Sequence, residues 1–336
     1  MSVVKKLAGQ TAIYGLSSII GRLLNYFLVP LHTLKFTEKE YGEISEFYAY
    51  VAFFVVLLTM GMETTFFRFV NKSEDKEKTF NQAFSLVLVL NVIFLASVIG
   101  FSTQVAGAMG YPQYENYVIW FACVLAFDAT SAILLAKLRY LEQPKKFAII
   151  QLTSIGVNIG LNLLFLLWLF DDYPAVGIGF VFLANLFASA VKPLMLYKEL
   201  SSFRFVFDRA LAKAMIWFSV PLLIASFAGI INETLDRILL KNLLLSEGEE
   251  FAKSQVGIYS ANYKLAIFIT IFIQAFRYAA EPFFFSLETD ENRDKTYSKV
   301  MTWFVIVVSL MFLVIASNLE IFKWFIPNES YHEGLK

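Results

Sequence analysis

The segment FNQAFSLVLVLNVIFLASVIGFST, residues 80–103, contains no charged residue. A membrane-spanning helix needs about 20 mostly apolar residues, so this segment is long enough to cross a bilayer. The whole chain of 336 residues has the same character, with 58% hydrophobic residues, 17% charged residues and a mean hydropathy of +0.61. Soluble domains carry about 25% charged residues, which argues against an ordinary soluble enzyme. We therefore predict an all-α polytopic membrane protein.

Eight further segments are apolar over a similar length. The nine predicted spans are 11–34, 44–68, 80–103, 116–136, 147–170, 174–197, 214–240, 257–284 and 300–326. The longest break, 198–213, contains three phenylalanines and is typical of an interfacial connector between two halves. The first span is too long for a cleaved signal peptide, so we expect it to remain as a helix.

The distribution of Lys and Arg predicts the orientation. With the N-terminus in the cytoplasm, the cytoplasmic segments hold 18 of the 28 Lys and Arg residues and the opposite segments hold 5. Loops rich in Lys and Arg stay on the cytoplasmic side of a membrane. We expect a multi-pass protein of the inner membrane with a cytoplasmic N-terminus.

Charge and composition exclude several kinds of site. The 28 basic residues balance the 28 acidic residues, which gives no reason to expect a nucleic-acid partner. One cysteine and two histidines argue against a metal centre, and we expect no metal and no cofactor. The chain has no GxxxxGK[ST] motif, so direct ATP hydrolysis is not expected.

An internal repeat follows from sliding the chain against itself by 215 residues. Arg22 then falls on Arg237, Gly42 on Gly257 and Pro112 on Pro327. The shift pairs the first three spans with the last three in the same orientation, an architecture found in transporters. We expect a six-helix bundle over residues 1–200 and a partial second bundle over 201–336. By symmetry at least three more helices should follow, so we expect the 336 residues to be a truncated chain.

Several motifs resemble the polysaccharide-transport branch of the multidrug/oligosaccharidyl-lipid/polysaccharide exporter superfamily. The segments that carry the resemblance are GQTAIYG at 9–15, GRLLN at 21–25, YG at 41–42, AKLR at 136–139, PKKF at 144–147, YSANYKLA at 259–266 and AAEPFF at 279–284. The resemblance implies two helical bundles around a central cavity. It also implies a flippase rather than an enzyme, which moves undecaprenyl-pyrophosphate-linked oligosaccharide repeat units, such as O-antigen or capsule units, to the outer leaflet by alternating access. The implied partners are the lipid-linked oligosaccharide, membrane lipids and polysaccharide assembly proteins.

Basic residues inside the spans are the candidates for binding such a substrate. A charge at mid-span costs about 2.5–3.5 kcal/mol on insertion scales, and such residues usually face a bundle interior or a wet cavity. A pyrophosphate group needs cations on its path, and a guanidinium binds it through two parallel hydrogen bonds. The candidate substrate-binding residues are Arg22, Asn25, Arg237, Lys264 and Arg277.

Structural pairing is the alternative for two of these cations. Glu233 precedes Arg237 by four residues and Glu281 follows Arg277 by four, so each pair can neutralise itself on one helix face. Arg22 and Lys264 have no acidic residue three or four positions away, which favours a functional role.

Acidic residues inside the spans are candidates for ion coupling, since transporters often bind a proton or Na⁺ at intramembrane carboxylates. They are Glu63, Asp128, Glu233, Asp236 and Glu281. They can equally serve as counter-ions to the basic residues. Asp128 is the most isolated of them in the sequence.

Two other functions stay open. A cation-coupled multidrug exporter of the same superfamily would have a cavity dominated by acidic and aromatic residues. A membrane glycosyltransferase or polymerase would need a sizeable extramembrane loop, whereas the predicted outer loops are short.

Overall fold

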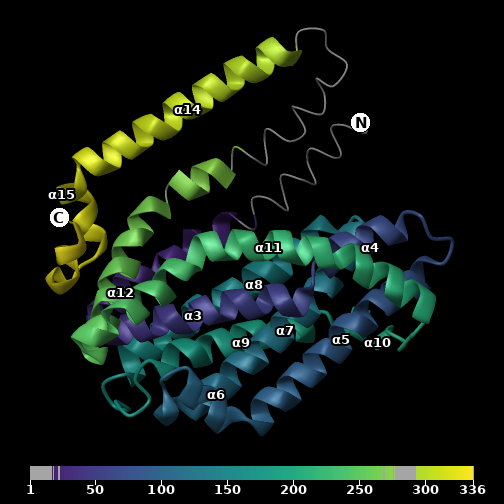
Figure 1. Cartoon of the computed structure of the whole chain (residues 1–336), viewed down its shortest axis with the longest axis horizontal. Helices are drawn as coiled ribbons and strands as arrows, with labels where there is room; N and C mark the ends of the chain where they lie inside the picture. Colours follow the sequence, from purple (N-terminus) through teal and green to yellow (C-terminus); the bar gives the residue numbers. More distant parts are fainter. Residues whose placement is uncertain are drawn as a thin grey trace. The chain divides into compact units, whose positions relative to one another are not determined.

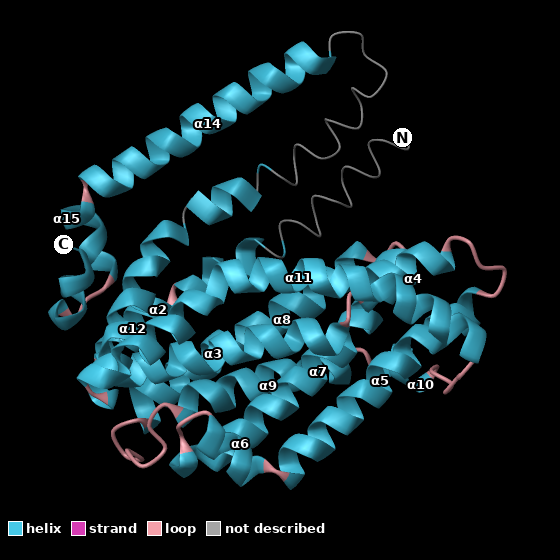
Figure 2. Ribbon diagram, viewed as in Figure 1, coloured by secondary structure: helices cyan, strands magenta, loops and turns pink. Residues whose placement is uncertain are grey.

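The computed structural model describes residue 17 and residues 19–21, 23–267, 269–274, 276 and 293–335, and within these residues it is mostly helical and contains no β-strand (Figure 2). The helices are α2 (Leu28–Lys35), α3 (Glu38–Thr59), α4 (Met62–Val70), α5 (Lys76–Gly100), α6 (Ser102–Ala108), α7 (Glu115–Tyr140), α8 (Pro144–Leu164), α9 (Gly179–Met195), α10 (Tyr197–Ser201), α11 (Arg209–Leu244), α12 (Glu249–Tyr263), α14 (Arg293–Ser317) and α15 (Leu319–Phe322). A π turn, Phe165–Leu169, extends α8, and 3-10 turns occupy Pro112–Tyr114, Leu245–Glu247, Lys264–Ala266, Lys323–Phe325 and Glu329–Leu335.

Six helical segments of the described residues are long and apolar enough to cross a membrane. They are Glu38–Val70, Lys76–Gly100, Pro112–Tyr140, Pro144–Leu169, Arg209–Glu247 and Arg293–Ser317, and the 17-residue helix α9 is a shorter apolar helix. These seven correspond to seven of the predicted spans. The predicted spans 11–34 and 257–284 fall partly outside the described residues, so the count of nine stays a prediction.

The predicted span 44–68 lies within the candidate membrane span Glu38–Val70, which has a short break in its helix. It consists of α3 and α4, which are separated at Met60 and Gly61, where φ is 50° and 61°. A positive φ is readily adopted by glycine, and the Gly61 backbone forms the N-terminal cap of α4. Both residues at the break are apolar, so hydropathy alone could not locate it.

Helices α5 and α11 start earlier than predicted because polar capping residues precede their apolar runs. The Asp75 carboxylate accepts a hydrogen bond from the Lys78 backbone N–H at 2.9 Å and begins α5. The Asp208 carboxylate accepts from the backbone N–H groups of Ala210 and Leu211 at 3.0 and 3.1 Å and begins α11. Such side chains satisfy the N–H groups that a helix leaves unpaired in its first turn.

The chain divides into two compact units, one formed by residues 1–43 and 244–336 and the other by residues 44–243. In the second, which we call the 44–243 unit, α7 packs against α4, α5, α6, α8 and α9. The long helices of this unit run alongside one another (Figure 1). The predicted boundary near residue 200 stays a prediction.

The connector that follows α10 lies on α5 within the 44–243 unit. Backbone N–H groups of Arg204, Val206 and Asp208 donate to the side chains of Asn81, Ser85 and Gln82 at 3.4, 3.0 and 2.6 Å, respectively. Alternate N–H groups of an extended chain point the same way, which is why residues two apart bind the same helix. The connector is therefore held by polar side chains of α5 that the sequence places inside an apolar span.

A buried charged cluster joins α3 to α11 in the same unit. The carboxylate of Glu46 accepts hydrogen bonds from Lys241 Nζ at 2.7 Å, from the Tyr111 hydroxyl and from the Tyr50 hydroxyl at 3.3 Å. Lys241 also lies over the Tyr111 ring, 4.5 Å from its centroid. Lys241 lies one residue beyond the predicted span 214–240, and in the structure it is a buried residue of α11. Buried charges are retained only when they are paired, and here the pairing is complete.

The unit of residues 1–43 and 244–336 has its own apolar core. Its buried residues are Tyr41, Ile258, Ala261, Leu265, Ile326 and Tyr331. The Tyr331 hydroxyl donates to the Phe36 carbonyl oxygen at 2.9 Å, and burial raises the pKa of this phenol. The hydrogen bond ties the C-terminal 3-10 turn to the segment between α2 and α3.

Candidate functional site

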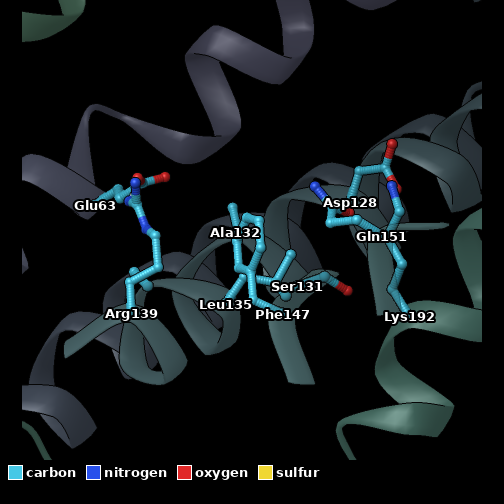
Figure 3. Close-up of a pocket in the computed structure, with 10 residues that line it drawn as sticks. Glu63, Asp128, Ser131, Ala132, Leu135, Arg139, Phe147, Gln151 and Lys192 are labelled. Carbon is cyan, nitrogen blue, oxygen red and sulfur yellow. The ribbon is translucent and has the colours of Figure 1, made fainter. Parts of the chain in front are cut away.

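A polar cavity of about 220 Å³ lies inside the 44–243 unit (Figure 3). Its lining residues are Glu63, Asp128, Ser131, Ala132, Leu135, Ala136, Arg139, Phe147, Gln151 and Lys192. Charged side chains at membrane depth usually mark a path for a substrate or an ion. We therefore take this cavity, called the α7 cavity below, as the candidate functional site.

Four helices build the α7 cavity, and α7 contributes most of it. Its six lining residues, from Asp128 to Arg139, are spaced three or four positions apart or adjacent, which places them on one face of a helix. Glu63 comes from the first turn of α4 and Lys192 from the last turn of α9. Phe147 and Gln151 lie four residues apart on α8 and therefore on the same face.

Two ion pairs stand in the wall of the cavity. Lys192 Nζ lies 2.9 Å from an Asp128 carboxylate oxygen, and the Arg139 guanidinium pairs with the Glu63 carboxylate. Figure 3 shows Glu63 and Arg139 together, Asp128 and Lys192 together, and Ser131 between the two pairs. Each pair joins α7 to a different helix, so the charges both line the cavity and hold its walls.

Neutral polar groups complete the surroundings of the ion pairs. Ser131 is 1% exposed, and its hydroxyl oxygen has no hydrogen-bond partner within the part of the chain that the structure describes. A buried hydroxyl without a partner costs free energy, so it points to a ligand or water. The Tyr48 hydroxyl of α3 accepts a hydrogen bond from Asn185 at 3.1 Å and lies within the electrostatic range of Asp128.

Two of the predicted ion-coupling candidates, Glu63 and Asp128, are brought together by the fold in the α7 cavity. Neither is isolated, because each has a basic partner on another helix. Their partners Arg139 and Lys192 belong to the last turns of α7 and α9, and in the sequence they were counted only among the basic residues of the cytoplasmic segments.

Arg237 is neutralised locally, as the alternative interpretation expected, but by a different side chain. Its guanidinium donates to the Asp236 carboxylate at 3.1 Å and to the backbone carbonyl oxygen of Glu233 at 2.6 Å. The carboxylate of Glu233 was the predicted partner, and Glu233 is exposed. These three residues do not line the α7 cavity.

The remaining predicted residues are Asn25 and Lys264, in the other unit, and three that cannot be placed. Asn25 is an exposed helical residue, and Lys264 is half-buried at the start of a 3-10 turn after α12. Arg22, Arg277 and Glu281 lie outside the described residues. The proposed role of Arg22 and Lys264 in substrate binding therefore stays a prediction.

Four polar or charged lining residues of the cavity were missed as site residues: Ser131, Arg139, Gln151 and Lys192. The spacing of Asp128, Ser131, Leu135 and Arg139 on one helix face was visible in the sequence and could have suggested a polar stripe on α7. Nothing local in the sequence pairs Asp128 with Lys192, which lies 64 residues away.

Solved structures with a similar fold include a transporter. The chain superimposes on an inward-facing conformation of a multidrug resistance MATE family transporter of the MOP superfamily with a TM-score of 0.63, over 96% of this chain and 72% of that one. The two sequences are 13% identical, so the likeness shows the fold and not the substrate.

Two proteins of Haemophilus influenzae (strain ATCC 51907 / DSM 11121 / KW20 / Rd) are similar in sequence. One, named for the Lsg locus, is 19% identical over 96% of this chain and 75% of its own length. The other, a membrane protein, is 19% identical over 85% of this chain and 66% of its own length. The present chain therefore spans about two thirds to three quarters of these relatives.

The family model for polysaccharide biosynthesis proteins matches residues 7–288, which is most of the chain. This match, the helical transporter fold and the apolar helices agree with one another. The chain is a multi-pass membrane protein that belongs to the polysaccharide biosynthesis protein family.

Proposed function

We propose that the protein is a flippase for lipid-linked oligosaccharides in surface polysaccharide biosynthesis. It moves undecaprenyl-pyrophosphate-linked repeat units from the inner to the outer leaflet of the cytoplasmic membrane by alternating access. The protein acts as a transporter and not as an enzyme. The lipid tail stays in the bilayer while the sugars and the phosphates pass through a wet interior.

The observation that carries this proposal is the α7 cavity, which places Arg139 and Lys192 inside a membrane-spanning bundle of a polysaccharide biosynthesis family member. A phosphate charge cannot cross about 30 Å of hydrocarbon without compensation. A guanidinium and an ammonium ion are the side chains that compensate it, the first by paired hydrogen bonds and the second as a point charge.

Export of a cationic drug is the second candidate function. The similar solved structure is a multidrug resistance transporter, and the α7 cavity also contains the carboxylates of Glu63 and Asp128. Family membership favours a polysaccharide precursor over a drug. The two functions predict different effects of deleting the gene: loss of surface polysaccharide for the first and raised drug sensitivity for the second.

The orientation is part of the same proposal. A cytoplasmic N-terminus puts the polar loop of residues 71–75, the end of α7 and the connector at 202–208 on the cytoplasmic side. The excess of Lys and Arg in these segments supports this orientation. A reporter tag inserted after Ser73 should therefore be inaccessible to an impermeant probe in intact spheroplasts and accessible after lysis.

A deletion strain tests the proposal directly. We expect loss of surface polysaccharide, accumulation of the lipid-linked repeat unit on the cytoplasmic side and unchanged drug sensitivity. Complementation with the full-length wild-type gene should restore the polysaccharide. An unchanged polysaccharide together with raised sensitivity to cationic drugs would favour the second function instead.

A further inference from the structure

The charges of the α7 cavity sum to zero. Its charged lining residues are two carboxylates, Glu63 and Asp128, and two cations, Arg139 and Lys192, and each carboxylate already lies against one cation. An anion that entered this arrangement unchanged would meet no net positive charge. It could bind only by replacing the carboxylates as partners of the two cations.

The middle of the cavity offers hydrogen bonds that the ion pairs do not use. The Ser131 hydroxyl is buried without a hydrogen-bond partner in the described part of the chain, and it lies between the two ion pairs (Figure 3). The Gln151 side chain from α8 lines the same space. A hydroxyl and an amide donate to phosphate oxygens as well as to water, so the site is built for a ligand rich in acceptors.

We infer that the α7 cavity binds the diphosphate group of the substrate by exchanging ion pairs. The phosphate oxygens take the places of the Glu63 and Asp128 carboxylates on Arg139 and Lys192, and the displaced carboxylates each bind a proton from water. The protons return to water when the diphosphate leaves. This inference rests on the proposed function and specifies how its site works.

The reason for the proton uptake is the balance of charge. Two carboxylates and a diphosphate in one small cavity would face only two cations, and like charges at close range favour protonation of the weaker acid. Glu63 and Asp128 are the carboxylates that line the cavity, Lys192 lies against Asp128, and Tyr48 of α3 lies within the electrostatic range of Asp128. Nearby, Lys137 of α7 is already paired with Glu77 of α5 at 3.3 Å. Protonation of the two carboxyl groups brings the net charge of the cavity with bound diphosphate closer to zero. A neutral complex is less costly to move through a membrane.

Proton uptake and anion binding must then favour each other, because linkage between two ligands is reciprocal. Diphosphate affinity should fall as the pH rises, by about tenfold per pH unit for each proton taken up. A site that bound a cationic drug would behave in the opposite way, because protonation of the carboxylates removes their attraction for a cation, so affinity for the drug should rise with pH.

Calorimetry on the full-length protein in detergent tests the exchange, with inorganic pyrophosphate as the probe. Titrations in buffers of different ionisation enthalpy report the protons bound with each anion. Pyrophosphate itself titrates, so the decisive quantity is the difference between the wild type and the Glu63→Gln/Asp128→Asn variant. We expect the wild type to take up protons when pyrophosphate binds. The variant should bind pyrophosphate more tightly, and the part of the proton uptake that the two carboxylates provide should be absent.

Matched variants separate this site from other ion pairs. Lys192→Gln should weaken pyrophosphate binding at least tenfold, whereas Lys146→Gln should leave it unchanged, because the Lys146–Glu199 pair does not line the cavity. Glu77→Gln, which breaks the Glu77–Lys137 pair, should retain the wild-type proton uptake. If the double variant does not fold, Glu63→Gln alone should remove part of the uptake.

Three results would overturn the inference. In the first, Lys192→Gln does not affect pyrophosphate binding. In the second, the wild type and the Glu63→Gln/Asp128→Asn variant take up the same number of protons when pyrophosphate binds. In the third, the protein binds tetraphenylphosphonium and Asp128→Asn abolishes that binding. The polysaccharide phenotype of the deletion strain is measured separately. If the deletion strain loses its surface polysaccharide and any of these three results is also found, the proposed function stands and only the exchange of ion pairs is refuted.

Discussion

Gly42 of α3 and Gly257 of α12 pack backbone against backbone. A Cβ atom on Gly42 would overlap the Lys253 carbonyl oxygen, and a Cβ atom on Gly257 would overlap the Glu38 carbonyl oxygen. A shift of 215 residues carries Gly42 onto Gly257 and Glu38 onto Lys253, so the contact is reciprocal. Reciprocal contacts of this kind are made by elements related by a two-fold axis. The predicted repeat stays a prediction, and this contact supports it.

Substitution of Gly42 by alanine should separate α3 from α12. There is no room for a methyl group at a backbone contact, so we expect a loss of about 1–3 kcal/mol in stability and a lower midpoint in thermal unfolding of the purified protein. Gly257→Ala should have the same effect because its surroundings are equivalent.

Gly160→Ala on α8 is the control for these substitutions, because a Cβ atom there would meet nothing within 4 Å. It should be neutral or slightly stabilising, as expected for glycine replaced in an open helix position. Equal midpoints for Gly42→Ala and Gly160→Ala would show that the helices are not in contact at Gly42.

Removal of one charge from the Glu46–Lys241 pair should destabilise the protein strongly. Lys241→Met leaves the Glu46 carboxylate buried without its cation, and breaking one side of a buried ion pair typically costs about 3–5 kcal/mol. The variant with both changes, Glu46→Gln and Lys241→Met, removes both charges and should recover part of the loss. Thermal unfolding of Glu46→Gln, of Lys241→Met and of the double variant measures this, and an additive loss in the double variant would disprove the coupling.

Acid should weaken the cap of α11. The Lys78 ammonium ion, which donates to Asp208 at 2.7 Å, holds the pKa of Asp208 below its ordinary value of about 3.9. A carboxyl group with a lowered pKa stabilises the fold fully above its ordinary pKa, and that contribution is lost as the pH falls through the lowered value. Asp208→Asn keeps a capping side chain but removes the charge.

The difference in unfolding midpoint between the wild type and Asp208→Asn should therefore be largest above about pH 4 and shrink in more acidic solution. Thermal unfolding in a series of acidic buffers measures it. A difference that grows as the pH falls would contradict the assigned role of the carboxylate.

Reversal of a cavity ion pair tests whether its position or only its presence matters. Asp128→Lys alone places two cations together and should prevent export of surface polysaccharide. Asp128→Lys combined with Lys192→Asp restores the attraction between α7 and α9 and should recover the folded protein, as measured by its abundance in the membrane. If abundance does not recover in the double variant, the two residues do not face each other in the membrane.

The helical architecture could be predicted from the sequence because a run such as residues 80–103 has one stable form in a bilayer. An apolar helix satisfies its own backbone groups, so length and hydropathy are sufficient to identify it. The helix ends were predicted less well. Asp75 and Asp208 begin their helices from polar positions, and the break at Met60 and Gly61 involves no polar residue.

The candidate site was predicted only in part, because local spacing does not reveal contacts between helices. Glu63 and Asp128 were identified as intramembrane acids, but their partners Arg139 and Lys192, near the ends of apolar runs, were counted only as basic residues that set the orientation. Spacing by four residues predicted the Glu233 carboxylate as a local partner for Arg237, yet the guanidinium donates to the neighbouring Asp236 carboxylate and to the Glu233 backbone carbonyl oxygen. A side chain four positions away competes with every group that the fold brings near.

Translocation in proteoliposomes tests the central claim most directly. The full-length protein is reconstituted with a fluorescent undecaprenyl-pyrophosphate-linked oligosaccharide, and the fraction that reaches the outer leaflet is measured with an impermeant quencher or lectin. We expect translocation by the wild type and by Lys146→Gln, and little above protein-free vesicles for Lys192→Gln at equal reconstitution. Wild-type vesicles that move the lipid no faster than empty ones would contradict the claim.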